Sequence, residues 1–272
     1  MKPTGSFTIA GVNVATYNAG QQGSDLALLF LHSNSSSMHA FERQISAFGH
    51  LTLLSFDLPG HGESENAGTV EDYSLRFYAD VLKYFLSTVQ AKRVLLVGWS
   101  LGGHVILEAL NELTTTTSAV LVGTPPLRSI EDMGSAFLPS PALALIQKGP
   151  ISAAEAEIWA MSCTCAGPQY PHWLKSDFER TDPAARIGLI NSLGSGTFKN
   201  EWDQISVAKI PVTLVFGAED QFVNKSFLVG PLLQNLWGKR IETLSTAGHM
   251  AHWDSDQAFN YIIADRIQNF GI

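Results

Sequence analysis

The chain of 272 residues carries a formal net charge of −8 at pH 7, and 45% of its residues are hydrophobic. That length suffices for one large domain, or two small ones, with a sizeable core. The acidic balance, without any stretch rich in lysine and arginine, argues against nucleic acid and anionic membranes as partners.

Apolar segments and turn signals alternate along the chain. We expect an opening hairpin around Gly11 and a long amphipathic helix at 73–89. Further strands are predicted at 26–31, 51–56, 94–97, 119–122, 212–216 and 241–244, and further helices at 38–48, 101–113, 225–236 and 255–270. This alternation predicts an α/β fold with a mostly parallel sheet that helices cover on both faces. Ligands of such sheets bind at the carboxyl ends of the strands.

Residues 130–205 interrupt this alternation. The segment contains six prolines, short helical patches and no convincing strand. Its aromatic side chains, among them Trp159 and Trp173, have to be buried or to line something. We therefore predict a core domain made of residues 1–129 and 206–272, with residues 130–205 inserted as a helical cap.

The sequence also bears on the compartment. Residues 1–5 lack the apolar segment of a secretory signal, and no apolar run approaches the roughly 18–20 residues that span a bilayer. The two cysteines, Cys163 and Cys165, are separated by one residue, a spacing poorly suited to a disulfide. We therefore expect reduced thiols and a cytoplasmic protein.

A motif for nucleophilic catalysis follows the strand predicted at 94–97. Residues 98–102 read Gly-Trp-Ser-Leu-Gly, the G-x-S-x-G pattern of a nucleophile elbow, between a strand and a helix. The two glycines avoid collisions where strand and helix nearly touch. The serine, Ser100, stands at a helix N-terminus, where oriented N–H groups favour a developing negative charge. Ser100 is therefore the predicted nucleophile of a serine hydrolase.

A serine hydroxyl needs a general base and a group that orients this base. In enzymes with this elbow the chain order is nucleophile, acid, histidine. His249, between the last predicted strand and the last helix, is the predicted base. His252 is expected at the pocket or at a helix start, and His104 is expected to pack in the helix after the elbow. Asp220, after the penultimate strand, is the predicted acid, and its neighbour Glu219 is the alternative.

The oxyanion of such a reaction needs two N–H donors. One is the backbone of Leu101, directly after the nucleophile. The other is expected from the serine-rich loop at 32–37, where Asn34 offers a backbone donor and a side-chain amide. Ser37 can cap the helix that follows. The Asp-Leu-Pro-Gly-His-Gly turn at 57–62 is predicted to set the edge of the sheet rather than to take part in catalysis.

Several segments together carry a resemblance to a known family. They are His-Ser-Asn-Ser-Ser-Ser at 32–37, Gly-Trp-Ser-Leu-Gly-Gly-His at 98–104, Gly-Thr-Pro-Pro at 123–126, Gly-Ser-Gly-Thr at 194–197, Asn-Leu-Trp at 235–237 and Ala-Gly-His at 247–249. Over essentially its whole length the chain resembles the α/β-hydrolase superfamily. Within it, the chain is most similar to the metal-independent N-acyl-homoserine lactone hydrolases, which are quorum-quenching lactonases. This resemblance implies an α/β-hydrolase fold with Ser100 as nucleophile, His249 as base and Asp220 as acid.

The resemblance also implies Asn34 at the oxyanion and lactone site, with an aromatic residue of the cap near the substrate. Two positions depart from the family. Ser33 replaces the glycine before Asn34, which reduces the backbone freedom of the loop. Trp159 stands in place of a cap tyrosine, so that an indole N–H replaces a hydroxyl as the group that contacts the substrate.

Together these residues predict an enzyme that opens the lactone ring of N-acyl-homoserine lactones through an acyl-enzyme. The alternatives are a general carboxylesterase that acts on small open-chain esters and a non-catalytic small-molecule binding protein of the same fold. We expect no cofactor and no metal, because the sequence has no His-x-His-x-Asp-His cluster and no His, Asp or Glu immediately beside its cysteines. The expected partner is a small ester or lactone, and the oligomeric state is not predicted.

Overall fold

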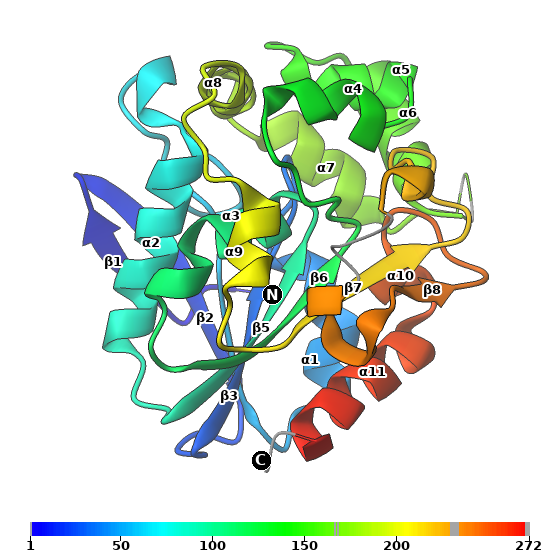
Figure 1. Ribbon diagram of the computed structural model, residues 1–272. Helices are drawn as coiled ribbons and strands as arrows, with labels where there is room; N and C mark the ends of the chain where they lie inside the picture. Colours follow the sequence, from blue (N-terminus) through cyan, green and yellow to red (C-terminus); the bar gives the residue numbers. More distant parts are fainter. Residues whose placement is uncertain (1, 166, 168, 229–233, 270–272) are drawn as a thin grey trace.

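The molecule is built around one sheet. In the computed structural model, which describes residues 2–165, 167, 169–228 and 234–269, eight strands form this sheet in the order β1-β2-β4-β3-β5-β6-β7-β8 (Figure 1). The strands are β1 (Gly5–Ile9), β2 (Val12–Gly20), β3 (Leu26–Leu31), β4 (Thr52–Phe56), β5 (Arg93–Trp99), β6 (Thr116–Val122), β7 (Val212–Gly217) and β8 (Glu242–Leu244). β2 pairs antiparallel with β1 and β4, whereas the neighbours from β4 to β8 are parallel. The predicted mostly parallel sheet is confirmed.

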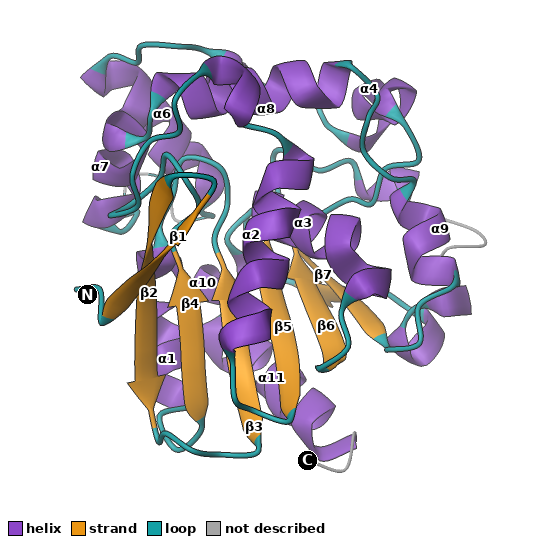
Figure 2. Ribbon diagram, turned by 90° about the vertical axis from the view of Figure 1, so that its left-hand side faces the viewer, coloured by secondary structure: helices purple, strands orange, loops and turns teal. Residues whose placement is uncertain are grey.

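Helices cover both faces of the sheet and the carboxyl ends of its parallel strands (Figure 2). They are α1 (Glu42–Ala47), α2 (Leu75–Thr88), α3 (Leu101–Ala109), α4 (Met133–Ala136), α5 (Pro141–Ala144), α6 (Ala153–Cys163), α7 (His172–Arg180), α8 (Pro183–Gly194), α9 (Glu201–Ser206), α10 (Ala251–Asp254) and α11 (Asp256–Asn269). Side chains of β3 alternate between two cores: Leu29 and Leu31 pack with α2 and α3, and Leu28 and Phe30 pack on the side of α11. This alternation explains why the strand reads as a continuous apolar run.

Two predicted helices change character along their length. The segment at 38–48 begins as a 3-10 turn, Met38–Phe41, before α1, and Ser37 caps it by accepting the N–H of His39, as predicted. The segment at 225–236 was expected to be one helix, but residues 229–233 lie outside the described residues. On either side the chain forms a 3-10 turn, Lys225–Phe227, and a β-bridge from Leu236 to Val212. The predicted helix does not include Leu236, because pairing with β7 requires extended backbone there.

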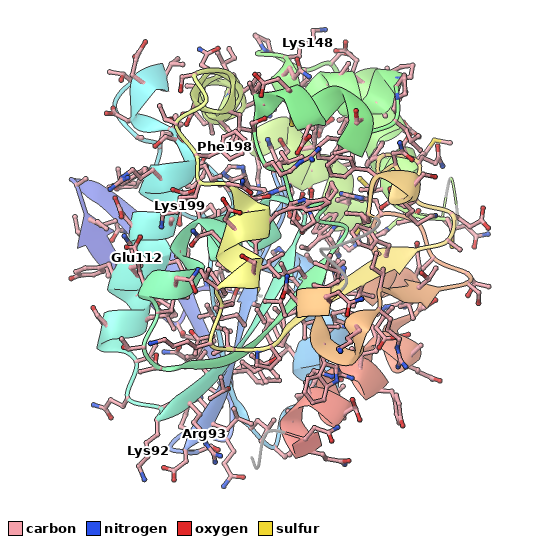
Figure 3. All side chains as sticks on the ribbon, viewed as in Figure 1. Lys92, Arg93, Glu112, Lys148, Phe198 and Lys199 are labelled. Atoms are coloured by element: carbon pink, nitrogen blue, oxygen red, sulfur yellow. The ribbon has the colours of Figure 1, made fainter. Side chains whose placement is uncertain are left out.

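Helices α4 to α9 come between β6 and β7 in the chain. Figure 2 shows α4, α6, α7 and α8 above the carboxyl ends of the parallel strands. α9 instead packs against α3. Just before α9, Lys199 forms an ion pair with Glu112 near the end of α3 (Figure 3). The segment therefore reaches from above the sheet down to the face that α3 covers.

The turn after β4 connects three parts of the sheet edge. Buried Asp57 accepts hydrogen bonds from the Tyr17 hydroxyl at 2.7 Å and from the N–H groups of Met38 and Glu63, each at 2.8 Å. A Cβ on Gly62 would lie 2.0 Å from the Asp57 carboxylate, so this position needs glycine. The interactions hold β2, the turn and the loop after β3 together, which is the structural role predicted for this turn.

Cys163 is buried, Cys165 is exposed, and both are free thiols, as their spacing predicts. Among the helices of the described ranges, none is long and apolar enough to cross a membrane.

Buried His252 makes stability depend on pH. Its ring packs between Phe41 and Trp99, with centroid distances of 4.9 and 5.2 Å, and burial lowers its pKa from 6.5 to about 3. Below pH 6.5 the unfolded chain binds a proton at this residue that the folded chain does not bind. The free energy of unfolding therefore falls as the pH drops from about 6.5 towards 3, by at most ~1.4 kcal/mol per pH unit.

We predict that His252→Phe loses less stability between pH 7 and pH 5 than the wild type. Urea denaturation at both pH values measures the difference. The matched control is His50→Gln, which changes an exposed histidine and should keep the wild-type pH dependence. If His252→Phe lost as much stability between pH 7 and pH 5 as the wild type, His252 would not be a source of the pH dependence.

Candidate active site

Ser100 lies on a sharp turn between β5 and α3. Its backbone has a φ of +52°, a conformation that is strained for a residue with a side chain. The turn brings strand and helix so close that a Cβ on Gly98 would lie 2.7 Å from the Gly102 backbone, and one on Gly102 would lie 2.3 Å from the Leu31 carbonyl oxygen. The Ser100 N–H donates to Val122 at 2.8 Å, which anchors the turn to β6. The predicted elbow is therefore present.

His249 forms a hydrogen bond with Asp220 next to this elbow. Its Nδ1 lies 2.9 Å from Asp220 Oδ2, and both side chains are buried. The other carboxylate oxygen accepts the N–H groups of Phe222 and Val223 at 2.8 and 3.2 Å. Because a carboxylate can only accept, Nδ1 of the neutral ring carries the proton and Nε2 is left as an acceptor. Glu219, the alternative acid, is exposed and does not form this contact.

The loop that carries His249 is held by distant parts of the chain. The Trp99 indole donates to the His249 carbonyl at 3.1 Å. Asp254 accepts the N–H of Gly248 at 2.8 Å and that of Cys165 at 2.9 Å. The histidine loop is thereby tied to β5 and to the chain just after α6.

The loop after β3 brings polar groups to the same place. His32 Nε2 accepts the N–H of Leu58 at 2.9 Å, so its Nδ1 donates to the Ser33 carbonyl at 2.7 Å. Burial lowers the pKa of His32 to about 4, which keeps this ring neutral. The Ser35 hydroxyl donates to Asn34 Oδ1 at 2.7 Å, and this leaves the Asn34 amide nitrogen for a ligand. The Ser33 hydroxyl is buried and has no hydrogen-bond partner among the described residues.

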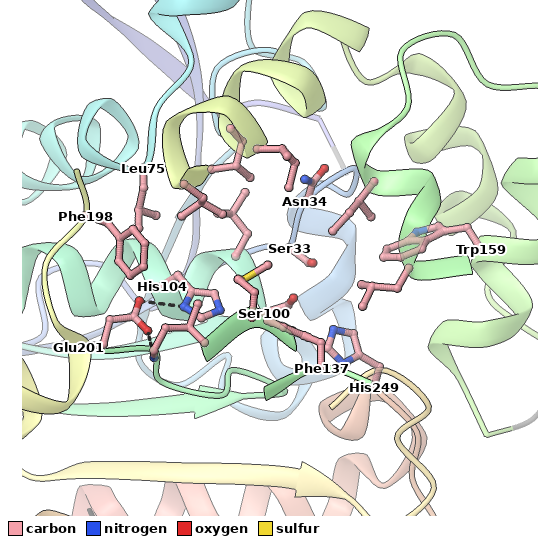
Figure 4. Close-up of a pocket in the computed structure, with 18 residues that line it drawn as sticks. Ser33, Asn34, Leu75, Ser100, His104, Phe137, Trp159, Phe198, Glu201 and His249 are labelled. Atoms are coloured by element: carbon pink, nitrogen blue, oxygen red, sulfur yellow. Dashed lines mark hydrogen bonds and ion pairs between the residues drawn. The ribbon is translucent and has the colours of Figure 1, made fainter. Parts of the chain in front are cut away.

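Ser33, Asn34, Ser100 and His249 line one pocket (Figure 4). Five residues predicted for the site lie on its wall: Ser100, His249, Asn34, Leu101 and Trp159. Asp220 lies behind His249. Most of the remaining wall is apolar and comes from α2, α4, α5 and α8 and the loops beside them. A mostly apolar pocket with a few convergent polar groups is typical of a site for a small, partly apolar molecule.

Trp159 is buried in the wall of this pocket. Its ring stacks on Phe178 and Phe222, with centroid distances of 5.0 and 5.2 Å. Phe222 in turn contacts the His249 ring edge-on, at a centroid distance of 5.0 Å. The indole N–H has no hydrogen-bond partner within the described part of the chain.

Two polar residues of the pocket were not predicted for it. His104, which was expected to pack in the helix after the elbow, also lines the pocket, and its Nδ1 lies 2.8 Å from Glu201 Oε1. His104 is four residues after Ser100, so both lie on one face of α3. That spacing was visible in the sequence. Glu201 had no such signal, since a glutamate in the first turn of a short helix is ordinarily solvated.

In the ranges that the structure describes, no group of three or more His, Cys, Asp or Glu side chains is arranged to hold a metal ion.

The chain is similar to known proteins in both sequence and structure. A model of the alpha/beta hydrolase family matches residues 28–260. The chain belongs to this family. A solved structure of the N-acyl homoserine lactonase AidH, a serine-to-glycine mutant complexed with N-hexanoyl homoserine lactone, is similar to the chain with a TM-score of 0.90. The identity is 28%, and the match covers 98% of this chain and 97% of that one.

Two other α/β hydrolase relatives are more distant. A putative aryl esterase from Burkholderia cenocepacia has a TM-score of 0.80 at 22% identity, over 97% of this chain and 98% of that one. A putative 2-succinyl-6-hydroxy-2,4-cyclohexadiene-1-carboxylate synthase of Bacillus subtilis is 24% identical over 267 residues, 94% of each chain. The predicted α/β-hydrolase fold and the resemblance to the lactonases are confirmed.

Proposed function

We propose that this α/β hydrolase opens the lactone ring of N-acyl-homoserine lactones, with Ser100 as nucleophile, His249 as base and Asp220 as acid. The observation that carries the proposal is the Asp220–His249 hydrogen bond of 2.9 Å, beside an elbow serine that shares its pocket. The similarity to a lactonase over nearly the whole of both chains supports the lactone as substrate.

The first half of the reaction forms an acyl-enzyme. Nε2 of His249 accepts the Ser100 proton while the serine oxygen attacks the lactone carbonyl carbon. The N–H groups of Leu101 and Asn34 hold the resulting oxyanion. When the ring C–O bond breaks, His249 returns the proton to the leaving oxygen, which becomes a hydroxyl.

In the second half of the reaction, hydrolysis of the acyl-enzyme competes with re-closure of the lactone ring. The new hydroxyl stays tethered to the acyl group, and a well-oriented intramolecular attack can reach an effective concentration of ~10⁵ M. A pocket that turns this hydroxyl away from the carbonyl favours water. His249 then deprotonates a water molecule, which attacks the acyl-enzyme and releases Ser100 and the open-chain carboxylate.

Residues 130–205 act in this proposal as a cap domain on a core of residues 1–129 and 206–272. Helices α4, α6, α7 and α8 lie above the carboxyl ends of the strands (Figure 2), and residues of α4, α5, α6 and α8 line the pocket. Five apolar residues line both the pocket and an adjoining groove: Met133, Phe137, Leu143, Ile146 and Ile190. This continuous apolar wall suits an acyl chain that leaves the catalytic residues along the cap.

The direct test compares N-hexanoyl-homoserine lactone with a matched open-chain ester, the methyl ester of N-hexanoyl-2-aminobutyrate. We expect faster turnover of the lactone, with a product heavier by one water molecule, and no loss of activity after exhaustive EDTA treatment. Ser100→Ala should lower kcat by at least about a thousandfold with an unchanged fold.

Each alternative function has its own outcome in this test. Faster hydrolysis of the open-chain ester would point to a general carboxylesterase. Binding without turnover would point to a small-molecule binding protein. A Ser100→Ala variant that keeps a tenth of the wild-type kcat would refute the assigned nucleophile.

The acid can be tested with two adjacent substitutions. Asp220→Asn removes the carboxylate that fixes the His249 tautomer, and in a serine protease the equivalent change lowers kcat by ~10⁴. Glu219→Gln changes an exposed carboxylate next to it and serves as the matched control. We expect a severe loss of kcat for Asp220→Asn and nearly wild-type kinetics for Glu219→Gln. The reverse ranking would exclude Asp220 as the acid.

Trp159 is expected to govern the preference for acyl chains. Each buried CH₂ contributes ~0.8 kcal/mol, so Trp159→Ala should raise KM more for long-chain than for short-chain N-acyl-homoserine lactones. A small chromogenic ester should be hydrolysed almost as before. Trp159→Phe keeps the stacking on Phe178 and Phe222 but lacks the N–H, and it separates packing from hydrogen bonding. Equal losses of kcat/KM for every substrate would place Trp159 in the catalytic scaffold instead.

A further inference from the structure

The pocket contains a second pair of histidine and carboxylate that the proposed mechanism does not use. His104 of α3 and Glu201 of α9 are joined by a hydrogen bond of 2.8 Å between Nδ1 and Oε1. The Glu201 side chain is only 1% exposed, and its other oxygen accepts the N–H of Leu127 at 2.7 Å. A carboxylate buried this deeply next to a substrate pocket is costly unless it is fully hydrogen-bonded.

Three segments of the chain hold this pair in place. Asn200 caps α9 by accepting the N–H groups of Trp202 and Asp203, and the Trp202 indole donates to the Pro126 carbonyl at 2.7 Å. Just before α9, the Lys199 N–H donates to Glu108 of α3 at 2.8 Å. Glu201 is therefore positioned by the loop after β6 and by α3 itself.

The Glu201 carboxylate sets the tautomer of His104 and so determines which ring nitrogen keeps a free lone pair. Glu201 can only accept, so Nδ1 of the neutral ring has to donate to it, and Nε2 is an acceptor. Figure 4 shows this second nitrogen on the side of the ring turned towards Ser100. The pair thus presents a hydrogen-bond acceptor inside a mostly apolar pocket.

In a bound lactone, we expect His104 Nε2 to lie near the substituents on the carbon next to the reacting carbonyl. Side chains at positions i and i+4 of a helix have Cβ atoms about 5–6 Å apart, and the serine oxygen has to come within about 3–3.5 Å of the carbonyl carbon. In an N-acyl-homoserine lactone the amide nitrogen is bonded to the carbon beside this carbonyl. Its N–H is therefore within reach of a side chain one helical turn from Ser100. The Leu101 N–H and the Trp159 indole N–H are donors only, and Asn34 Oδ1 already accepts the Ser35 hydroxyl. His104 Nε2 is therefore the acceptor that this substrate N–H can use.

We propose that Glu201 fixes His104 as the acceptor for an N–H on the carbon next to the scissile carbonyl. His104 is then a specificity-determining residue that selects α-acylamino lactones and esters over analogues without this N–H. The inference rests on the proposed function for its lactone and adds the feature of the substrate that the pocket recognises. A site built to bind a donor discriminates strongly against a substrate that lacks it, because its buried acceptor is left unpaired.

Glu201→Gln tests the inference by reversing the polarity of His104. The glutamine carbonyl can still accept the Leu127 N–H, while its NH₂ group donates to Nδ1 and moves the ring proton to Nε2. The readout is the ratio of kcat/KM for N-hexanoyl-homoserine lactone to that for the analogue in which CH₂ replaces the amide N–H. We expect this ratio to be at least about tenfold in the wild type and to fall by about tenfold in Glu201→Gln.

Two further variants and a spectroscopic measurement complete the test. Nitrogen NMR of isotope-labelled histidine reports the tautomer directly, and we expect Nδ1–H in the wild type and Nε2–H in Glu201→Gln. His104→Phe removes the acceptor but keeps a ring of similar size, and it should lower the ratio as well. Glu108→Gln makes the same chemical change at a carboxylate that also positions the chain before α9 without touching His104. It should keep the wild-type ratio and tautomer.

The outcomes separate this inference from the proposed function. An Nε2–H tautomer in the wild type, or an unchanged ratio in Glu201→Gln after the tautomer has switched, would overturn the role of His104 while the lactonase function stands. If the wild type opens no N-acyl-homoserine lactone, the lactonase proposal fails. In that case the same pair of analogues, prepared as open-chain methyl esters, decides the role of His104.

Discussion

The close approach of α3 to the ends of β3 and β5 is the constraint on which the rest of the site depends. It exists because Gly98 and Gly102 have no side chains, and it forces Ser100 into a backbone conformation with a φ of +52°. The strain is held in place by the sheet on one side and the buried helix on the other. The same approach places the first N–H groups of α3 under the serine. It also sets the direction of the helix face on which His104 lies.

A second constraint is that buried polar groups need hydrogen-bond partners. The pocket wall includes two histidines, and each donates from Nδ1 to a buried carboxylate that also accepts backbone N–H groups. In both pairs the backbone bonds keep the carboxylate in place, and the carboxylate orients the ring. Asp220 accepts from the loop just after β7, whereas Glu201 accepts from the loop after β6. The two pairs thus connect the site to different strands of one sheet.

Much of the architecture could be predicted because its signals are local. The apolar runs of β3 and β5, the turn glycines and the G-x-S-x-G motif each have one physical explanation, and the structure confirms them. The order of nucleophile, acid and histidine also led to Asp220 and His249, which the fold brings within 2.9 Å. The segment at 225–236 was harder, since its apolar residues fit a helix as well as an extended segment that pairs with β7.

By itself, the sequence determined the elbow, the mostly parallel sheet with helices on both faces, and the residues at the ends of its strands. These depend on spacing and on the absence of side chains, which a linear pattern records. Only the tertiary structure decided that Glu219 is exposed while Asp220 is buried, and that Glu201 meets His104 across 97 positions of the chain. Such choices depend on burial and on which segments pack together. A short helix capped by Asn200 has the same pattern whether its glutamate faces solvent or a pocket, and the packing of α9 on α3 decides between them.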